Sequence, residues 1–326
     1  MPQSIPVRPF LLTLPLLLAA CGNGAQKDVP ADAAAQTATV NGVRVIDAST
    51  YQLGVSALDS AQAIIRSATL SSPSVTGLSA GQATAQVCGQ IQSQDVLTTA
   101  IALDSTGSMQ DTDPGMLREQ AAKAFVGRMT AGDRAAVLSF DSRTAPTAGL
   151  AVAHLWQDFT GDRGLLTTGI EHATFVGGGT PLYDAVIDAG TLVSQTTGAN
   201  RSVLVLTDGA DSSSVHSPTD VIAAAKANGT RVFAVGLDSA NTLDFSELER
   251  IASETGGLFQ KASDAAQLTG YFDHVYNAVS AQGCVQLKFT ALPKPGTSVS
   301  GTLAFTASVV GKADAQLSVP FTFTAR

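Results

Sequence analysis

The sequence predicts an α/β domain with a largely parallel sheet and helices on both faces, carried in a chain of 326 residues. Between residues 92 and 283, short apolar strands alternate with amphipathic helical patterns, the rhythm of a doubly wound sheet. Two of these strands run directly into an Asp followed by small polar residues. The segments on either side instead alternate apolar and polar residues with a period of two, which indicates a separate antiparallel sheet.

Four strands and five helices are expected in the α/β domain. The strands are residues 96–103, 135–140, 203–206 and 232–237. The first helix is expected to begin with Asp113 as N-cap and Pro114 as first helical residue. Its apolar face is formed by Leu117, Ala121, Ala124, Phe125 and Met129. Later helices are expected around 182–193, over 218–228 ending at Gly229, over 245–255 ending at Gly256, and around 268–279.

The flanking segments, residues 38–91 and 284–326, are predicted to pair into one smaller, discontinuous, sandwich-like all-β domain. The second segment is the clearer, because Val285, Leu287 and Phe289 alternate with polar residues and two further runs do the same. In the first segment, residues 58–68 are compatible with one short helix. The α/β domain, residues 92–283, is then an insertion in the β domain, although separate small domains are an alternative.

The N-terminal residues are predicted to direct export and membrane anchoring. Arg8 precedes an apolar run over 10–20, which is too short to span a bilayer and is typical of a signal peptide. The following Leu18-Ala19-Ala20-Cys21 resembles the lipobox of bacterial lipoproteins. That resemblance implies cleavage after residue 20 and lipid on Cys21, with residues 21–37 as a flexible tether. Because residue 22 is Gly rather than Asp, we expect the outer membrane rather than retention at the inner one.

Charge and cysteine content narrow the class of protein further. A net charge of −8 without a Lys/Arg cluster argues against a nucleic-acid partner. Once Cys21 is assigned to lipid, Cys88 and Cys284 remain. In an exported protein two remaining thiols favour one disulfide, with two separate buried thiols as the alternative.

Five residues with oxygen-bearing side chains form the candidate site, and each lies in a loop at a strand or helix end: Asp104, Thr106, Ser108, Thr180 and Asp208. Ligands of open α/β sheets bind beyond the carboxyl ends of the strands, so these loops are expected to meet. Three hydroxyls and two carboxylates suit a hard cation such as Mg²⁺, with Mn²⁺ or Ca²⁺ as alternatives. The absence of His and Cys from these loops argues against zinc or copper.

The five candidate residues lie in three motifs: DSTGS at 104–108, GGGTPLYDA around Thr180 and TDG at Asp208. Together these motifs resemble the metal-ion-dependent adhesion site of the von Willebrand factor A domain. The resemblance extends over about 185 residues in the family's element order and departs from it in carrying Thr106 where Ser is commoner. It implies a Rossmann-like fold, a bound divalent metal, and a protein partner that offers a carboxylate to the metal. Integrin β subunits carry such a domain inserted in a β-sandwich, and in them Asp residues after the motif help form a second metal site. Only Asp111 has a matching spacing here, and a helix cap or a solvated loop is the favoured interpretation.

The predicted function is therefore a membrane-anchored, metal-dependent protein-binding module for adhesion or envelope assembly. A structural envelope lipoprotein whose metal only stabilises the fold is the alternative. An enzyme is not expected, since the sequence lacks the common hydrolase, zinc-protease and nucleotide-binding motifs. A Mg²⁺-dependent phosphohydrolase would need a second carboxylate where Thr106 stands. Asp211 is predicted to be solvated, and His154, His172, His216 and His274 to be structural or exposed.

Overall fold

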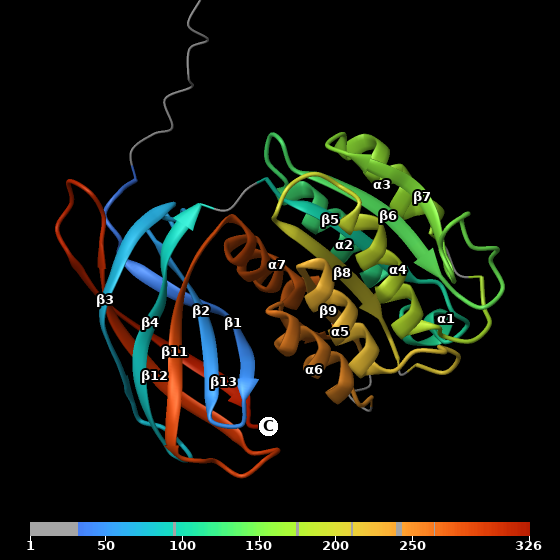
Figure 1. The fold of residues 1–326 in the computed structure, drawn as a ribbon. Coiled ribbons are helices and arrows are strands. Elements are labelled where there is room, and N and C mark those ends of the chain that lie inside the picture. Colours follow the sequence, from blue (N-terminus) through green and yellow to red (C-terminus); the bar gives the residue numbers. More distant parts are fainter. Residues whose placement is uncertain (1–31, 94–95, 174–175, 210, 239–242, 264) are drawn as a thin grey trace, which may run out of the picture. The chain divides into compact units, whose positions relative to one another are not determined.

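Two hydrogen-bonded sheets form the framework of the computed structural model (Figure 1). The structure describes residues 32–93, 96–173, 176–209, 211–238, 243–263 and 265–326. The predicted signal peptide, Cys21 and most of the tether lie outside the described residues. Within them, no helix is long and apolar enough to cross a membrane.

The first sheet has six strands in the order β10-β9-β8-β5-β6-β7. Five strands are parallel, and β7 pairs antiparallel with β6 at one edge. The strands are β5 (Thr98–Asp104), β6 (Arg134–Phe140), β7 (Ala153–Thr160), β8 (Arg201–Thr207), β9 (Thr230–Leu237) and β10 (Phe259–Ala262). The predicted, mostly parallel sheet is confirmed, and β7 and β10 are strands that the sequence analysis missed.

Helices cover both faces of this sheet. Along β8, Leu204 and Leu206 pack on one side, whereas Val203 and Val205 pack on the other, as expected for a strand buried on both faces. The first side is covered by α2 (Leu117–Arg128), α3 (Arg163–His172) and α7 (Ala265–Ser280). The second side is covered by α4 (Leu182–Ser194), α5 (Pro218–Asn228) and α6 (Ser246–Thr255). The doubly wound arrangement is therefore confirmed.

Two of the predicted helix ends are confirmed by the structure, and one predicted helix start is wrong. Gly229 and Gly256 follow α5 and α6 at the predicted helix ends, and both are left-handed, with φ of 62° and 79°. The start predicted at Asp113 and Pro114 is wrong, because α2 begins at Leu117. The Asp113 carboxylate still serves the helix: it accepts hydrogen bonds from the backbone N–H groups of Leu117 and Arg118 at 2.5 and 3.1 Å.

The second sheet is antiparallel and has seven strands in the order β1-β2-β11-β4-β3-β12-β13. They are β1 (Thr37–Asp47), β2 (Thr50–Leu58), β3 (Ser67–Thr76), β4 (Gln82–Ser93), β11 (Ala281–Ala291), β12 (Ser298–Ser308) and β13 (Ala315–Thr324). Strands from both chain ends pair directly, because β11 lies between β2 and β4. The rings of Tyr51 on β2 and Phe323 on β13 lie 4.5 Å apart, so strands distant in the sheet order face each other across one core.

The short helix predicted over residues 58–68 is wrong. The Asp59 carboxylate accepts hydrogen bonds from the backbone N–H groups of Ala61 and Ala63, at 2.8 and 2.9 Å, and Gln62 has a positive φ of 62°. These local bonds turn the chain between β2 and β3 and compete with helix formation.

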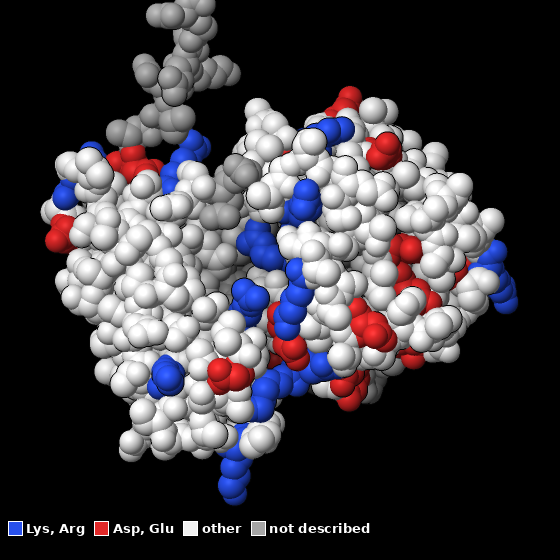
Figure 2. All heavy atoms as spheres, in the orientation of Figure 1, with Lys and Arg blue, Asp and Glu red and all other residues white. Residues whose placement is uncertain are grey.

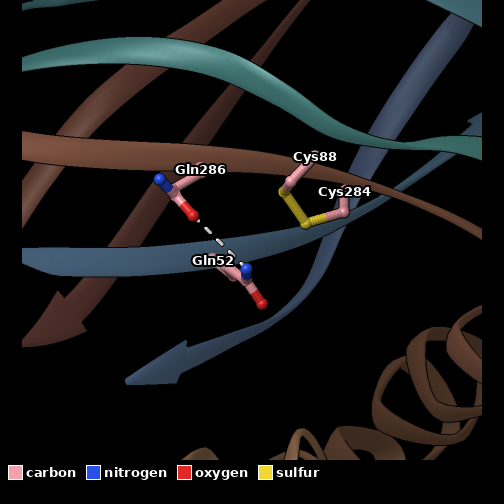
Figure 3. Close-up of a disulfide and its surroundings, with 4 residues drawn as sticks. All are labelled: Gln52, Cys88, Cys284 and Gln286. Carbon is pink, nitrogen blue, oxygen red and sulfur yellow. Dashed lines mark hydrogen bonds between the residues drawn. A yellow bond between two sulfur atoms is a disulfide. The ribbon is translucent and has the colours of Figure 1, made fainter. Parts of the chain in front are cut away.

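Cys88 of β4 and Cys284 of β11 form a disulfide between neighbouring strands (Figure 3), which confirms the predicted pairing. On β11 the side chains of Val285, Leu287 and Phe289 are buried in the core, whereas Cys284 and Gln286 alternate with them on the opposite face. Gln286 accepts a hydrogen bond from Gln52 of β2 on this face, at 3.4 Å. The disulfide therefore links the two sequence segments of the seven-stranded sheet outside its apolar core.

Candidate metal site

The candidate site lies at the point where the strand order of the six-stranded sheet reverses. After β5 the chain proceeds to β6 and β7 on one side, whereas β8, β9 and β10 follow on the other. Strands β5 and β8 are parallel neighbours, with Leu103 opposite Leu206. Asp104 ends β5 and Asp208 follows β8, so both carboxylates reach the same edge of the sheet. This topological switch point is the usual ligand-binding position of open α/β sheets.

Hydrogen bonds connect four of the five predicted residues in one chain of oxygen atoms. Thr106 Oγ1 donates to Asp104 Oδ1 at 2.6 Å, and Thr106 Oγ1 and Ser108 Oγ lie 3.3 Å apart. Ser108 Oγ in turn donates to Asp208 Oδ1 at 3.0 Å. The side chains of two strand ends that are far apart in the sequence therefore converge on one small region.

The glycine loop that precedes α4 carries Thr180 and lies against the DSTGS loop. Backbone N–H groups of Val176 and Gly177 donate to the Ser105 carbonyl at 2.9 and 3.1 Å, which holds the glycine loop on the DSTGS loop. A Cβ added at Gly107 would lie 3.6 Å from the Gly177 Cα, so the two backbones are in close contact. Gly177 adopts φ of 105°, a conformation that favours glycine. No hydrogen bond joins the Thr180 side chain to the other four predicted residues.

The spacing of the donor oxygens fits a hard divalent cation. In an octahedral site with Mg–O bonds of about 2.1 Å, neighbouring ligand oxygens lie about 3.0 Å apart. The Thr106–Ser108 and Ser108–Asp208 oxygen pairs, at 3.3 and 3.0 Å, are close to this edge length. The candidate donor set is mixed, because the hydroxyl oxygens of Thr106 and Ser108 lie between the carboxylates of Asp104 and Asp208. Within the described ranges no three His, Cys, Asp or Glu side chains cluster as a metal site.

Burial gives the site an unusual carboxyl group. Asp104 has an exposed fraction of 0%, and desolvation raises its pKa to about 6. Hydrogen bonds from Thr106 and Thr207 oppose this shift, and the charge of Asp208 adds to it. Without a cation, the carboxylate form of Asp104 is therefore costly near neutral pH, and a bound cation would relieve that cost.

Three residues around the predicted ligands were not predicted from the sequence: Thr112, Arg118 and Thr207. Thr207 Oγ1 donates to Asp104 Oδ2 at 2.6 Å, and Thr112 Oγ1 donates to Asp208 Oδ2. Arg118 is fully buried, and the charges of Asp113, Asp104 and Asp208 act on its guanidinium. Burial lowers the pKa of Arg118 and raises that of Asp113. A signal was present, because Arg118 lies four residues before Ala122 and seven before Phe125, on the buried face of α2.

The remaining acidic candidates have different roles. Asp111 is exposed in the short helix α1 (Met109–Thr112), in agreement with the solvated interpretation. The prediction that Asp211 is solvated is wrong, because its carboxylate accepts hydrogen bonds from the Leu182 N–H at 2.9 Å and from the Ser214 hydroxyl. Asp211 thereby caps the start of α4 with a side chain from the loop after β8.

The histidines make separate local contacts. His216 Nδ1 lies 2.7 Å from Asp184 Oδ1, and His154 Nδ1 lies 3.0 Å from the Ala145 carbonyl oxygen. The ring of His172 packs against Trp156 at a centroid distance of 5.7 Å. The side chain of His274 is outside the described part of the structure.

Comparison with known families identifies the α/β domain. The family model of the von Willebrand factor type A domain matches residues 100–274, more than half of the chain. The chain belongs to the von Willebrand factor A family. The match begins within β5 and extends into α7, so it includes all five predicted site residues.

Solved structures with similar folds include proximal thread matrix protein 1 from the mussel byssus, at 21% identity and a TM-score of 0.48. That match covers 64% of this chain and 51% of the mussel protein, about half of its length. A von Willebrand factor type A protein from Catenulispora acidiphila has 14% identity, coverage of 89% and 73%, and a TM-score of 0.46. The pilus adhesin SpaC from Lactobacillus rhamnosus GG has 11% identity, coverage of 86% and 48%, and a TM-score of 0.46. A search of curated proteins gives no match.

Proposed function

We propose that this protein is a membrane-anchored, divalent-metal-dependent protein-binding module that acts in adhesion or envelope assembly. The observation that carries the proposal is the convergence of Asp104, Thr106, Ser108 and Asp208 at the switch point of the sheet. Their oxygens suit Mg²⁺, with Mn²⁺ or Ca²⁺ as alternatives, and Thr180 is the fifth proposed ligand.

One side of the proposed site is open to solvent. The side chains of Asp104, Thr106, Thr180 and Asp208 are between 0% and 7% exposed, whereas Ser108 is exposed. Two carboxylates balance the charge of a divalent ion but supply only part of its oxygen shell. The remaining positions on the open side are available to water or to an incoming carboxylate. We therefore propose a protein partner that presents an Asp or Glu side chain to the metal.

The envelope location in this proposal depends on the sequence. The lipobox-like segment ending at Cys21 would anchor the chain, and the tether over 21–37 would separate the folded part from the membrane surface. We propose that the α/β domain is presented by the antiparallel sheet as an insertion between its two sequence segments. A nucleic-acid partner is not proposed: the net charge is −8, and the face in Figure 2 shows acidic and basic side chains interspersed over a mostly uncharged surface.

An affinity capture experiment tests this function. The full-length protein, extracted in mild detergent and immobilised, should capture an envelope protein in Mg²⁺ and release it in EDTA. Asp208→Ala should lose the capture, because it removes the carboxylate bonded to Ser108. Asp111→Asn is the matched control, since it removes an exposed acid three residues after the DSTGS loop and should capture normally. A set of captured proteins that is the same with EDTA and with Asp208→Ala would contradict the proposal.

The same variants separate a partner-binding metal from a purely structural one. The buried hydrogen bonds of Asp104 favour some structural contribution, because ion binding would hold the loops after β5 and β8 together. If the metal were only structural, EDTA would lower the melting temperature without releasing a partner. The proposed function predicts both effects together.

A further inference from the structure

The loop after β6 places a positively charged side chain beside the candidate metal site. The buried carboxylate of Asp141 accepts hydrogen bonds from the backbone N–H groups of Arg143 and Thr144, at 2.6 and 2.7 Å. It also accepts one from the Thr144 hydroxyl at 2.6 Å. The neighbouring Ser142 Oγ accepts a hydrogen bond from the Gly179 N–H at 2.7 Å, directly before Thr180. The backbone that carries Arg143 is therefore fixed to the glycine loop of the metal site.

The guanidinium of Arg143 lies against this glycine loop. A Cβ added at Gly177 would be 3.1 Å from Arg143 Nη1 and 3.5 Å from its Cζ. Gly177 in turn contacts Gly107, the residue between the proposed ligands Thr106 and Ser108. One layer of glycine backbone thus separates the guanidinium from the loop that would hold the metal. A side chain at Gly177 would crowd the Arg143 guanidinium, so the glycine at this position allows the guanidinium to lie against the loop.

The Arg143 guanidinium has no anionic partner in the part of the chain that the structure describes. Within the described residues the Arg143 side chain makes no hydrogen bond and no ion pair, and it is exposed. The Asp141 carboxylate, two residues before Arg143, already accepts hydrogen bonds from backbone and hydroxyl donors of the loop. A bound divalent ion would be balanced by Asp104 and Asp208 alone, so the unpaired guanidinium would leave one uncompensated positive charge beside the glycine loop. The ion and the guanidinium would repel each other across the glycine loop, and an anion that contacts both would relieve the repulsion.

We infer that the metal and Arg143 form one two-point site for an acidic protein segment, in which one carboxylate binds the metal and a second carboxylate pairs with Arg143. This inference rests on the proposed function and adds the chemistry of the partner to it. A planar guanidinium donates two parallel hydrogen bonds to one carboxylate, a geometry that a single lysine ammonium does not reproduce. The required partner therefore carries two acidic residues at a fixed separation rather than a single Asp or Glu.

Synthetic peptides provide the test. The full-length protein in mild detergent is titrated, in Mg²⁺ and in EDTA, with fluorescent Gly/Ser peptides that carry one Asp, or two Asp at increasing separations. In Mg²⁺, at least one two-Asp peptide should bind the wild type about fivefold more tightly than the one-Asp peptide, the upper range for an exposed ion pair. Arg143→Ala should abolish this difference, and Arg143→Lys should retain only part of it. Raising the salt concentration should also reduce the difference, because exposed charges are screened.

Two controls distinguish loss of the contact with Arg143 from a general change in charge or from unfolding of the metal loops. Arg66→Ala removes an equal charge from an exposed position before β3, and it should leave the difference between the peptides unchanged. Mg²⁺ affinity of Arg143→Ala that equals or exceeds that of the wild type shows that the metal loops remain folded, because removal of a positive charge cannot weaken cation binding by itself. Equal binding of the two peptide classes, or a difference that persists in Arg143→Ala, overturns the second contact while the metal-dependent function stands. If every peptide binds equally well with and without EDTA, the metal contact is refuted, and with it the proposed function.

Discussion

Proton competition at Asp104 should make metal binding depend strongly on pH. The pKa of this buried carboxyl group is raised to about 6, first by desolvation and further by the charge of Asp208. A divalent cation requires the ionised carboxylate, so protons compete with the metal below this pKa. Lowering the pH from 7 to 5 protonates about nine-tenths of the metal-free groups and should weaken Mg²⁺ binding about tenfold, or about 1.4 kcal/mol.

The metal-free protein should show the opposite trend in stability. The folded-state pKa of Asp104 is raised from 3.8, the value of an unperturbed Asp, to about 6. Between these values the folded state binds more protons than the unfolded state. The contribution of Asp104 to the free energy of unfolding therefore falls as pH rises from about 4 to 6, by about 3 kcal/mol in all. Mg²⁺ should offset this loss at pH 7 and have little effect at pH 5.

Thermal unfolding with EDTA and with Mg²⁺, at pH 5, 6 and 7, measures both trends. The stabilisation by Mg²⁺ should grow with pH in the wild type and in the control Asp111→Asn. In Asp104→Asn the carboxylate is absent, so the stabilisation and its pH dependence should both be lost. Identical Mg²⁺ affinities at pH 5 and pH 7 in the wild type would refute the role assigned to Asp104.

Three further predictions concern the surroundings of the site and the second sheet. The double variant Cys88→Ser/Cys284→Ser opens a link across 196 residues and should lower the free energy of unfolding by at most about 5 kcal/mol in urea titrations; an unchanged midpoint would contradict this. Arg118→Met removes a buried positive charge, of the same sign as the metal ion, that acts on Asp104 and Asp208, so calorimetry should show tighter Mg²⁺ binding by about 1 kcal/mol or more, and weaker binding would refute it. Asp211→Ala removes the side-chain cap of α4 and should cost about 1 kcal/mol, or about 2–4 °C in melting temperature; an unchanged melting temperature would show that the cap is dispensable.

Much of the fold was predictable because the local and the global signals agree. The buried strands β5, β6, β8 and β9 are continuous apolar runs, and α5 and α6 end at glycines with positive φ. The antiparallel edge strand β7 was missed because only Ala153 on it is fully buried, which leaves no clear alternation. Strand β10 was missed because it has four residues, too few for a periodic pattern.

The site was predictable in composition but not in its environment. Residue types and strand ends indicated which oxygens converge, because parallel neighbours such as β5 and β8 finish at the same edge. The raised pKa of Asp104 depends on complete burial by distant segments, which no local pattern of residues records. The position of Arg143 likewise depends on contact between two loops, and its approach to Gly177 follows only from the folded backbone.

We propose that the oxygens at the switch point of the sheet bind one divalent cation. Isothermal titration of Mg²⁺ into the full-length protein, after EDTA treatment and dialysis, measures this directly. We expect saturable binding of one ion per chain by the wild type and by Asp111→Asn, and none by folded Asp208→Ala. Binding of equal affinity and stoichiometry by Asp208→Ala, or no binding by the wild type, would contradict it.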